Sequence, residues 1–153
     1  MTNDEDVPRV ASASRVIAAD ARRIFDLIAD PVMQPSWDGN NNLAVASAGQ
    51  RVRSVGDVFT MTLTGDGAVR ENHVVEFNEG RCIAWRPAEL GQEPPGHLWR
   101  WTLEPIDASR TRVTHTYDWS ELVDENRLAR ARATTEDKLQ ASLDRLAAAA
   151  EDP

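Results

Sequence analysis

Hydrophobic and polar positions alternate with two different periods along this chain. Between residues 43 and 120 the apolar positions recur at every second residue, most clearly where Phe59, Met61 and Leu63 alternate with threonines. This period is typical of strands that bury one face. Short turn sequences rich in Gly, Asn and Asp divide the region. They predict six strands in a meander: 43–53, 57–64, 69–77, 81–86, 97–104 and 111–120.

Helical spacing is found on both sides of this strand region. After a predicted strand at 9–18, the residues Ile24, Leu27 and Ile28 share one face of a short helix. Asp20 can cap its start, and the helix stops before Pro31 because a residue that precedes proline is disfavoured in helical conformation. We expect one further short helical turn over 31–37.

Near the C-terminus, residues 124–150 predict one long helix. No proline or glycine interrupts the segment, and its alanine-rich composition favours a helix. At 1.5 Å per residue it is roughly 35–40 Å long, so it is the one predicted element long enough to cover the apolar face of the meander. Its apolar stripe consists of Leu128, Leu139, Leu143, Leu146 and Ala150.

This order of elements resembles the helix-grip fold of the START-like (SRPBCC) superfamily, an α+β fold. In that fold a curved antiparallel sheet of about seven strands wraps a long C-terminal helix, with two short helices after the first strand. Three stretches are similar to the opening, the last hairpin and the closing helix of its polyketide cyclase/dehydrase-like branch: IAADARRIFDLIADPVMQPSWD, HLWRWTLEPIDASRTRVTHTYDWSEL and KLQASLDRLAAAAE.

The resemblance covers residues 9–150 and implies a deep cavity between sheet and helix that holds an apolar or amphipathic small molecule. Members of the superfamily range from lipid carriers and ligand-binding proteins to aromatic cyclases. They share no catalytic motif that can be transferred to this chain residue by residue.

Length and charge narrow the classes of function. The chain has 153 residues, which suits one domain over 9–150 preceded by an acidic, disordered tail over 1–8. A net charge of −8 argues against nucleic-acid binding. The chain has no apolar run of membrane-spanning length, no signal-peptide pattern and a single cysteine, Cys82. We therefore expect a cytoplasmic protein without a membrane span.

Cross-strand pairing predicts which side chains face the long helix. The turn at 65–67 would place Phe59 opposite His73, and the turn at 78–80 would place His73 opposite Trp85. The last hairpin would pair alternate residues of its two strands in the same way. The predicted layers on this face are Phe59, His73, Trp85, Trp99 and Tyr117; Met61, Glu71, Pro87, His97 and Trp119; and Val75, Ile83, Trp101 and His115.

Large aromatic walls with a few polar groups are typical of a ligand pocket. The first hypothesis is therefore a protein that binds an apolar or aromatic small molecule without a cofactor. An ordinary packed core explains Trp99 and Trp101 equally well, because aromatic residues are enriched in strands, and each histidine alone fits a structural role. The predicted ligand-binding residues are Phe59, Met61, Trp85, His97, Trp99, Trp101, His115 and Trp119.

The second hypothesis is a cyclase or dehydratase that acts on an aromatic or polyketide-like substrate. Glu71 and His73 would lie about 7 Å apart on one face and could form an acid–base pair. Tyr117 would then donate a hydrogen bond to a developing enolate. A third hypothesis is a helper domain that acts on a partner protein through its surface and has a small, dry cavity.

Spacing argues against other chemistries. His97 and His115 are several pairs apart and no CxxC or HExxH motif is present, so we expect no metal site. Cys82 has the opposite parity to Trp85 and therefore faces away from the predicted pocket, which argues against a role as nucleophile. The Gly65-Asp66-Gly67 segment is a hairpin turn rather than a phosphate loop. The exposed strand edge at 43–53 leaves both a monomer and a homodimer open.

Overall fold

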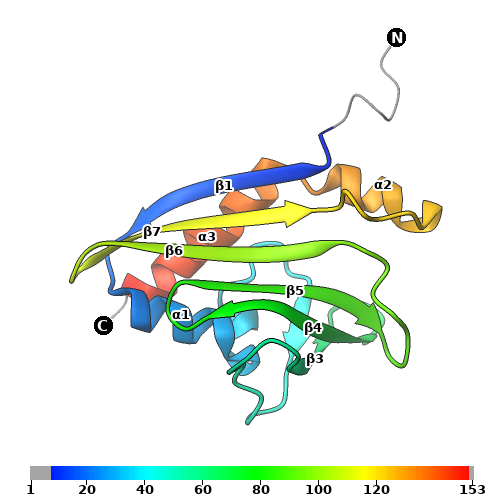
Figure 1. The fold of residues 1–153 in the computed structure, drawn as a ribbon, viewed down its shortest axis with the longest axis horizontal. Coiled ribbons are helices and arrows are strands. Elements are labelled where there is room, and N and C mark those ends of the chain that lie inside the picture. The colour runs from blue at the N-terminus through cyan, green and yellow to red at the C-terminus, as the bar shows by residue number, and fades with distance from the viewer. Residues whose placement is uncertain (1–7, 152–153) are drawn as a thin grey trace.

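The computed structural model describes residues 8–151 (Figure 1), so most of the tail predicted for residues 1–8 lies outside the described residues. Within that range seven strands form one antiparallel sheet in the order β1-β7-β6-β5-β4-β3-β2. The sheet and helices confirm the predicted helix-grip fold. The strands are β1 (Val10–Ile17), β2 (Leu43–Val45), β3 (Val58–Leu63), β4 (Val69–Asn78), β5 (Cys82–Glu89), β6 (Leu98–Asp107) and β7 (Arg110–Asp118).

Two short helices follow β1, as predicted. Helix α1 (Ala21–Ala29) begins after Asp20, whose carboxylate accepts a hydrogen bond from the Arg23 N–H at 2.8 Å. It ends at Asp30, and the 3₁₀ helix η2 (Pro31–Ser36) begins at the next residue. The predicted strand at 43–53 is wrong in length, because only the three residues of β2 pair with β3.

The predicted single C-terminal helix is two helices. Helix α2 (Glu125–Ala133) stops at Thr134, and α3 (Glu136–Glu151) continues after Thr135. The Thr134 N–H donates to the Ala131 carbonyl at 3.1 Å and its hydroxyl donates to the Arg130 carbonyl at 2.9 Å. These bonds satisfy carbonyls at the end of α2, and two adjacent β-branched residues weaken helix propensity at the break.

The two helices have different roles. Helix α3 lies across the sheet and contacts β1 and β7, whereas α2 projects beyond the end of β7 (Figure 1). Leu139, Leu143 and Leu146 of α3 are fully buried against the sheet. Each such side chain contributes on the order of 1.5–3 kcal/mol through burial. Helix α3 therefore stabilises the fold by packing on the sheet, whereas α2 lies at one end of the interior.

Register between β3 and β4 differs by one residue from the predicted pairing. Phe59 pairs with Asn72 and Met61 pairs with Arg70. The cause is a turn one residue shorter than the glycine pattern suggests, since Leu63 lies opposite Ala68 rather than Val69 and its N–H donates to the Ala68 carbonyl at 2.7 Å. A shift of one residue transfers every side chain of a strand to the opposite face.

A β-bulge at Val75 restores the later residues of β4 to the expected face. Val74 pairs with Trp85 and Phe77 pairs with Ile83, so two residues lie between Val74 and Phe77 on β4 where β5 has one. The first part of β4 consequently points Arg70, Asn72 and Val74 inward. The predicted pairing of His73 with Trp85 is also wrong, because His73 lies opposite Arg86. Three predicted pairings of the later strands are confirmed: Trp85–Trp99, Trp99–Tyr117 and Trp101–His115.

Candidate ligand-binding site

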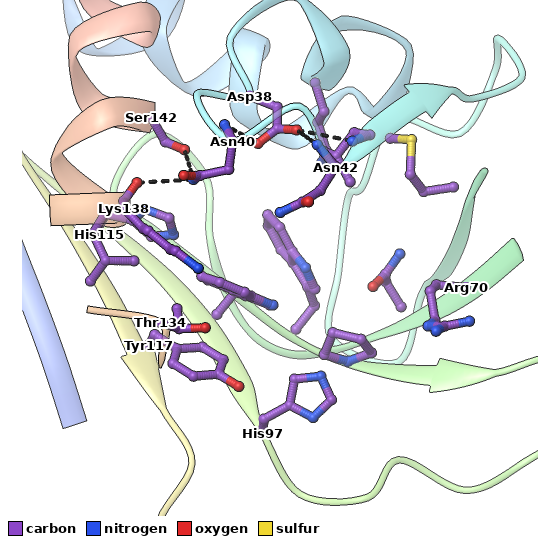
Figure 2. Close-up of a pocket in the computed structure, with 18 of the residues that line it drawn as sticks. Asp38, Asn40, Asn42, Arg70, His97, His115, Tyr117, Thr134, Lys138 and Ser142 are labelled. Carbon is purple, nitrogen blue, oxygen red and sulfur yellow. Dashed lines mark hydrogen bonds between the residues drawn. The ribbon is translucent and has the colours of Figure 1, made fainter. Parts of the chain in front are cut away.

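A cavity of about 250 Å³ lies between the inner face of the sheet and the C-terminal helices (Figure 2). Strands β3 to β7 form its floor. Helices α2 and α3 and the loop that follows η2 form the rest of the wall. The interior is therefore hollow toward α2.

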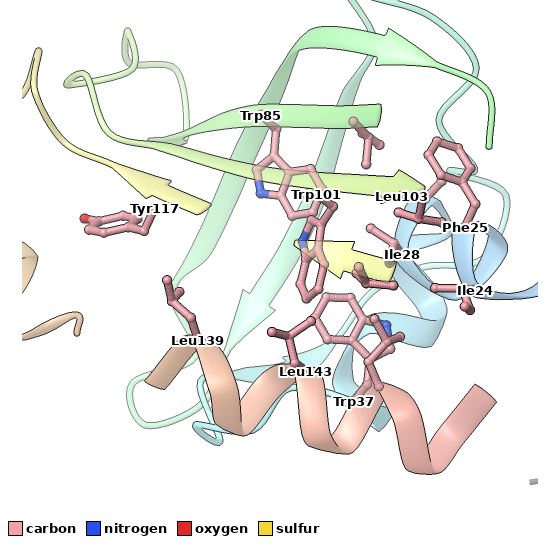
Figure 3. Close-up of a cluster of buried hydrophobic side chains, with 14 of the residues drawn as sticks. Ile24, Phe25, Ile28, Trp37, Trp85, Trp101, Leu103, Tyr117, Leu139 and Leu143 are labelled. Carbon is pink, nitrogen blue, oxygen red and sulfur yellow. The ribbon is translucent and has the colours of Figure 1, made fainter. Parts of the chain in front are cut away.

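The opposite end of the interior is packed. Figure 3 shows Ile24, Phe25 and Ile28 of α1 gathered beside Leu103, away from Tyr117 and Leu139. Phe25 is only 1% exposed and meets Phe77 edge-on at 5.7 Å between ring centroids. The aliphatic residues needed to fill a core thus stand at the α1 end, and large rings surround the space at the other end.

Aromatic rings from three adjacent strands form one wall of the cavity. Alternate residues of β5, β6 and β7 supply Trp85, Trp99, Trp101 and Tyr117, because alternate side chains of a strand share a face. Trp99 packs against Tyr117 with 4.3 Å between ring centroids. Trp101 stacks on His115 at 3.7 Å with 12° between the planes. The wall offers flat apolar surfaces suited to stacking a ligand ring.

Several polar atoms on this wall have no hydrogen-bond partner among the described residues. They are both ring nitrogens of His115, the indole nitrogen of Trp101 and Nδ1 of His97. Burial lowers the pKa of His115 to about 3, so its imidazole is neutral at pH 7. A buried polar atom without a partner costs about 1–3 kcal/mol. A polar ligand group would remove that cost.

His97 and Tyr117 lie together near the α2 end, with 6.1 Å between ring centroids. Burial raises the pKa of Tyr117 to about 12, so its phenol stays protonated and can donate a hydrogen bond. Burial and, to a smaller extent, nearby positive charges together lower the pKa of the His97 ring to about 4. These charges belong to Arg127, Arg130, Arg70 and Arg86.

Basic side chains dominate the charged lining of the cavity. Arg70 comes from β4, Arg127 and Arg130 from α2, and Lys138 from α3. Among the described residues, Asp38 supplies the one carboxylate of the lining.

The Asp38 carboxylate is used by the loop itself. It accepts hydrogen bonds from the backbone N–H groups of Asn40, Asn42 and Leu43, the last at 2.9 Å. Gly39 lies so close to the α3 backbone at Ala141 that a Cβ atom would collide with it. The loop is consequently fixed against α3, and its carboxylate faces its own backbone.

Seven of the eleven predicted site residues line this cavity: Met61, Trp85, His97, Trp99, Trp101, His115 and Tyr117. Phe59 and Trp119 lie in the packed core instead. Phe59 is held edge-on to Trp85, and Trp119 lies beneath the Arg9 guanidinium at 4.7 Å.

The placement predicted for Glu71 and His73 is wrong. Because of the register shift, Glu71 lies on the outer face, where its carboxylate accepts a hydrogen bond from the Gly91 N–H at 2.6 Å. His73 lies on the same face, between Val58 and Arg86 of the neighbouring strands. Neither residue lines the cavity, so they cannot act as an acid–base pair within it.

Sequence reasoning missed Arg70 and Asn72, which occupy the inward positions expected for Glu71 and His73. Arg127 and Arg130 of α2 also line the cavity and are not among the residues predicted from the sequence. The sequence does hold a signal for the part of the wall that the loop after Trp37 supplies, because a run of Asp, Gly and Asn next to a predicted pocket can form its wall.

Neither a membrane-spanning helix nor a metal cluster is found in the described residues. No helix between residues 8 and 151 is long and apolar enough to cross a membrane. In the same range, no group of three or more His, Cys, Asp or Glu side chains is placed to hold a metal ion.

The sheet, the C-terminal helices and the cavity between them are those of a helix-grip protein of the START-like superfamily. The chain belongs to the family described as "Polyketide cyclase / dehydrase and lipid transport", which it matches over residues 8–151.

An uncharacterised protein of Mycobacterium tuberculosis is 29% identical over 114 residues, which cover 73% of this chain and 48% of that protein. The chain thus spans about half the length of the curated relatives it matches. Because these relatives are uncharacterised, the similarity to them gives no information about function.

Solved structures share the fold at low sequence identity. A protein from Arthrobacter aurescens has a TM-score of 0.72 at 19% identity, over 99% of this chain and 91% of that one. The Zhui aromatase/cyclase from a Streptomyces species has a TM-score of 0.65 at 19% identity, over 94% and 93% of the two chains.

Proposed function

We propose that this protein binds an apolar or aromatic small molecule in the cavity between the sheet and the C-terminal helices. The observation that carries this proposal is the aromatic wall of Trp85, Trp99, Trp101 and Tyr117 around about 250 Å³ of open space. Walls of this kind with a few convergent polar atoms are the usual composition of a small-molecule site.

The shape of the site favours a compact ring system. Drug-sized ligands occupy pockets of roughly 300–1,000 Å³, so a cavity of about 250 Å³ lies just below that range. Trp99 and Tyr117, packed with 38° between their ring planes, present planar surfaces rather than a long channel. A flat aromatic molecule uses such surfaces better than an extended acyl chain does.

A cyclase or dehydratase that uses Glu71 and His73 is not proposed, because both residues lie on the outer face of the sheet. The similarity to an aromatase/cyclase is one of fold. Binding is the function that the cavity itself supports.

Native mass spectrometry of the freshly purified protein is the first test, and we expect a co-purified small molecule. Calorimetric titration with a panel of flat aromatic compounds and fatty acids is the second. Trp99→Leu removes a ring from the cavity wall and should weaken aromatic binding by about tenfold or more. Trp119→Phe alters a tryptophan outside the cavity and should leave affinity within about twofold.

Two results together would contradict the proposal: a protein that carries no small molecule, and a panel of which no member binds. Equal effects of Trp99→Leu and Trp119→Phe on affinity would place the binding site elsewhere.

A further inference from the structure

The cavity and the whole molecule carry charges of opposite sign. The chain has a net charge of −8. Its cavity is lined by four cations (Arg70, Arg127, Arg130 and Lys138) and one carboxylate, Asp38. Such a reversal of sign is not expected from a random sampling of an acidic surface. It is the arrangement that attracts an anion into a cleft.

Most of these cations lack a carboxylate partner. Among the described residues, the side chains of Arg70, Arg130 and Lys138 take part in no ion pair. Arg127 is paired with Glu89 and Asp124, both at 3.3 Å. Since Asp38 accepts backbone hydrogen bonds from its own loop, its carboxylate is already occupied. The positive charge of the lining is therefore not neutralised within the site.

Neutral hydrogen-bonding groups stand beside the cations. Figure 2 shows His97 and Tyr117 between Arg70 on one side of the cavity and Lys138 on the other. The Tyr117 phenol is protonated and can donate, and Nδ1 of His97 is buried without a partner. A carboxylate, sulfonate or phosphate oxygen could accept from a phenol or an imidazole N–H and from a guanidinium.

We propose that the ligand of this cavity is an organic anion, with its ring system on the tryptophan wall and its acidic group near His97, Tyr117, Arg70 and Arg130. This inference rests on the proposed function and narrows it to one class of ligand. Planar guanidinium groups bind such acidic groups through paired hydrogen bonds, which gives both charge and orientation.

Naphthoate and naphthamide provide a matched pair of probes, because they share ring system and size and differ in charge. In calorimetric titrations at neutral pH and low salt, naphthoate should bind about tenfold or more tightly than naphthamide. Added salt should weaken naphthoate binding and leave naphthamide binding nearly constant, because salt screens charge interactions at the partly exposed mouth.

The double variant Arg70→Gln, Arg130→Gln tests the residues named. It should reduce the preference for naphthoate to about twofold or less and retain naphthamide binding, which also reports that the variant is folded. Arg112→Gln is the single-charge control, because Arg112 is exposed and lies outside the cavity lining. It should change the preference by less than about twofold.

Each other outcome is decisive. Equal affinities of the two probes, or tighter binding of naphthamide, would overturn the anion inference and leave the proposed function standing. A neutral or cationic co-purified molecule would do the same. Loss of both probes in equal measure by the double variant would refute recognition of charge by Arg70 and Arg130. Failure of both probes to bind the unaltered protein would overturn the inference, and the wider ligand panel would then decide the proposed function separately.

Discussion

His115 is placed at a cost to the stability of the fold. Its ring is 4% exposed, stacks on Trp101 and leaves both nitrogens without a partner among the described residues. A phenylalanine could stack in the same place without unsatisfied polar atoms. The histidine therefore makes physical sense on the wall of a site where a ligand or water completes its hydrogen bonds.

Acidification should reveal this cost. The pKa of His115 is about 3 in the folded protein and 6.5 in an exposed histidine, so the unfolded chain binds more protons between these values. Stability is complete above about pH 6.5 and is lost as pH falls, by about 2 kcal/mol from His115 at about pH 5. His97, whose pKa is about 4, adds a loss in the same direction. Urea denaturation at several pH values measures the slope.

His115→Phe supplies the control for this pH dependence. The variant should be more stable than the natural chain at about pH 5, and its stability should change less between about pH 6.5 and 5. The carboxyl groups with lowered pKa, such as Glu76, act only below their ordinary value of 4.5 and do not interfere in this window. An unchanged slope in His115→Phe would show that other groups cause the acid sensitivity.

Among the elements, β4 decides which polar groups enter the cavity. Its bulge at Val75 permits Arg70 and Asn72 to face inward at one end while Phe77 packs on Phe25 at the other. Regular alternation satisfies only one of these two ends. The extra residue is thus a condition for both the packed core and the basic lining.

Deleting Val75 should therefore unfold or strongly destabilise the protein. Either Phe77 leaves the core or Val74, which is 2% exposed, turns outward. We expect a loss of about 3 kcal/mol or more in the free energy of unfolding, measured by urea denaturation. Val75→Thr keeps the bulge and should change stability by less than about 0.5 kcal/mol, since Val75 is exposed. A deletion variant with unchanged stability would contradict this role.

Helix α2 should be the least protected helix of the fold. Ala131 is its one fully buried residue in the described structure, and the Arg127–Glu89 ion pair joins it to β5. Its amides should exchange with deuterium faster than those of α3, which buries six residues. A bound aromatic ligand should slow exchange in α2 more than in α3, as measured by mass spectrometry of peptides. Equal protection of both helices in the free protein would contradict this.

For the molecule as a whole, the sequence was sufficient for the architecture but only partly for the site. Strand alternation and helical stripes are local patterns, so they predicted the strand order and the pairing of Trp101 with His115. The lining contributed by β4 depends on the length of the β3–β4 turn and on the bulge at Val75. Both are determined by packing between distant parts of the chain rather than by a local sequence pattern. The break between α2 and α3 at Thr134 was likewise not predictable from a local pattern, because the sequence there contains no proline or glycine.

Packing and binding occupy different ends of the same interior, so substitutions should separate stability from affinity. Phe25→Ala removes a buried ring at the α1 end and should cost about 3–5 kcal/mol of stability, with ligand affinity of the folded fraction nearly unchanged. Trp99→Ala, at a half-buried ring of the cavity wall, should cost about 1–2 kcal/mol of stability but lower aromatic affinity about tenfold or more. Urea denaturation and calorimetry on the same two variants measure both quantities. Parallel losses of stability and affinity in the two variants would show that the interior acts as one unit, because a change at either end would then reach the other.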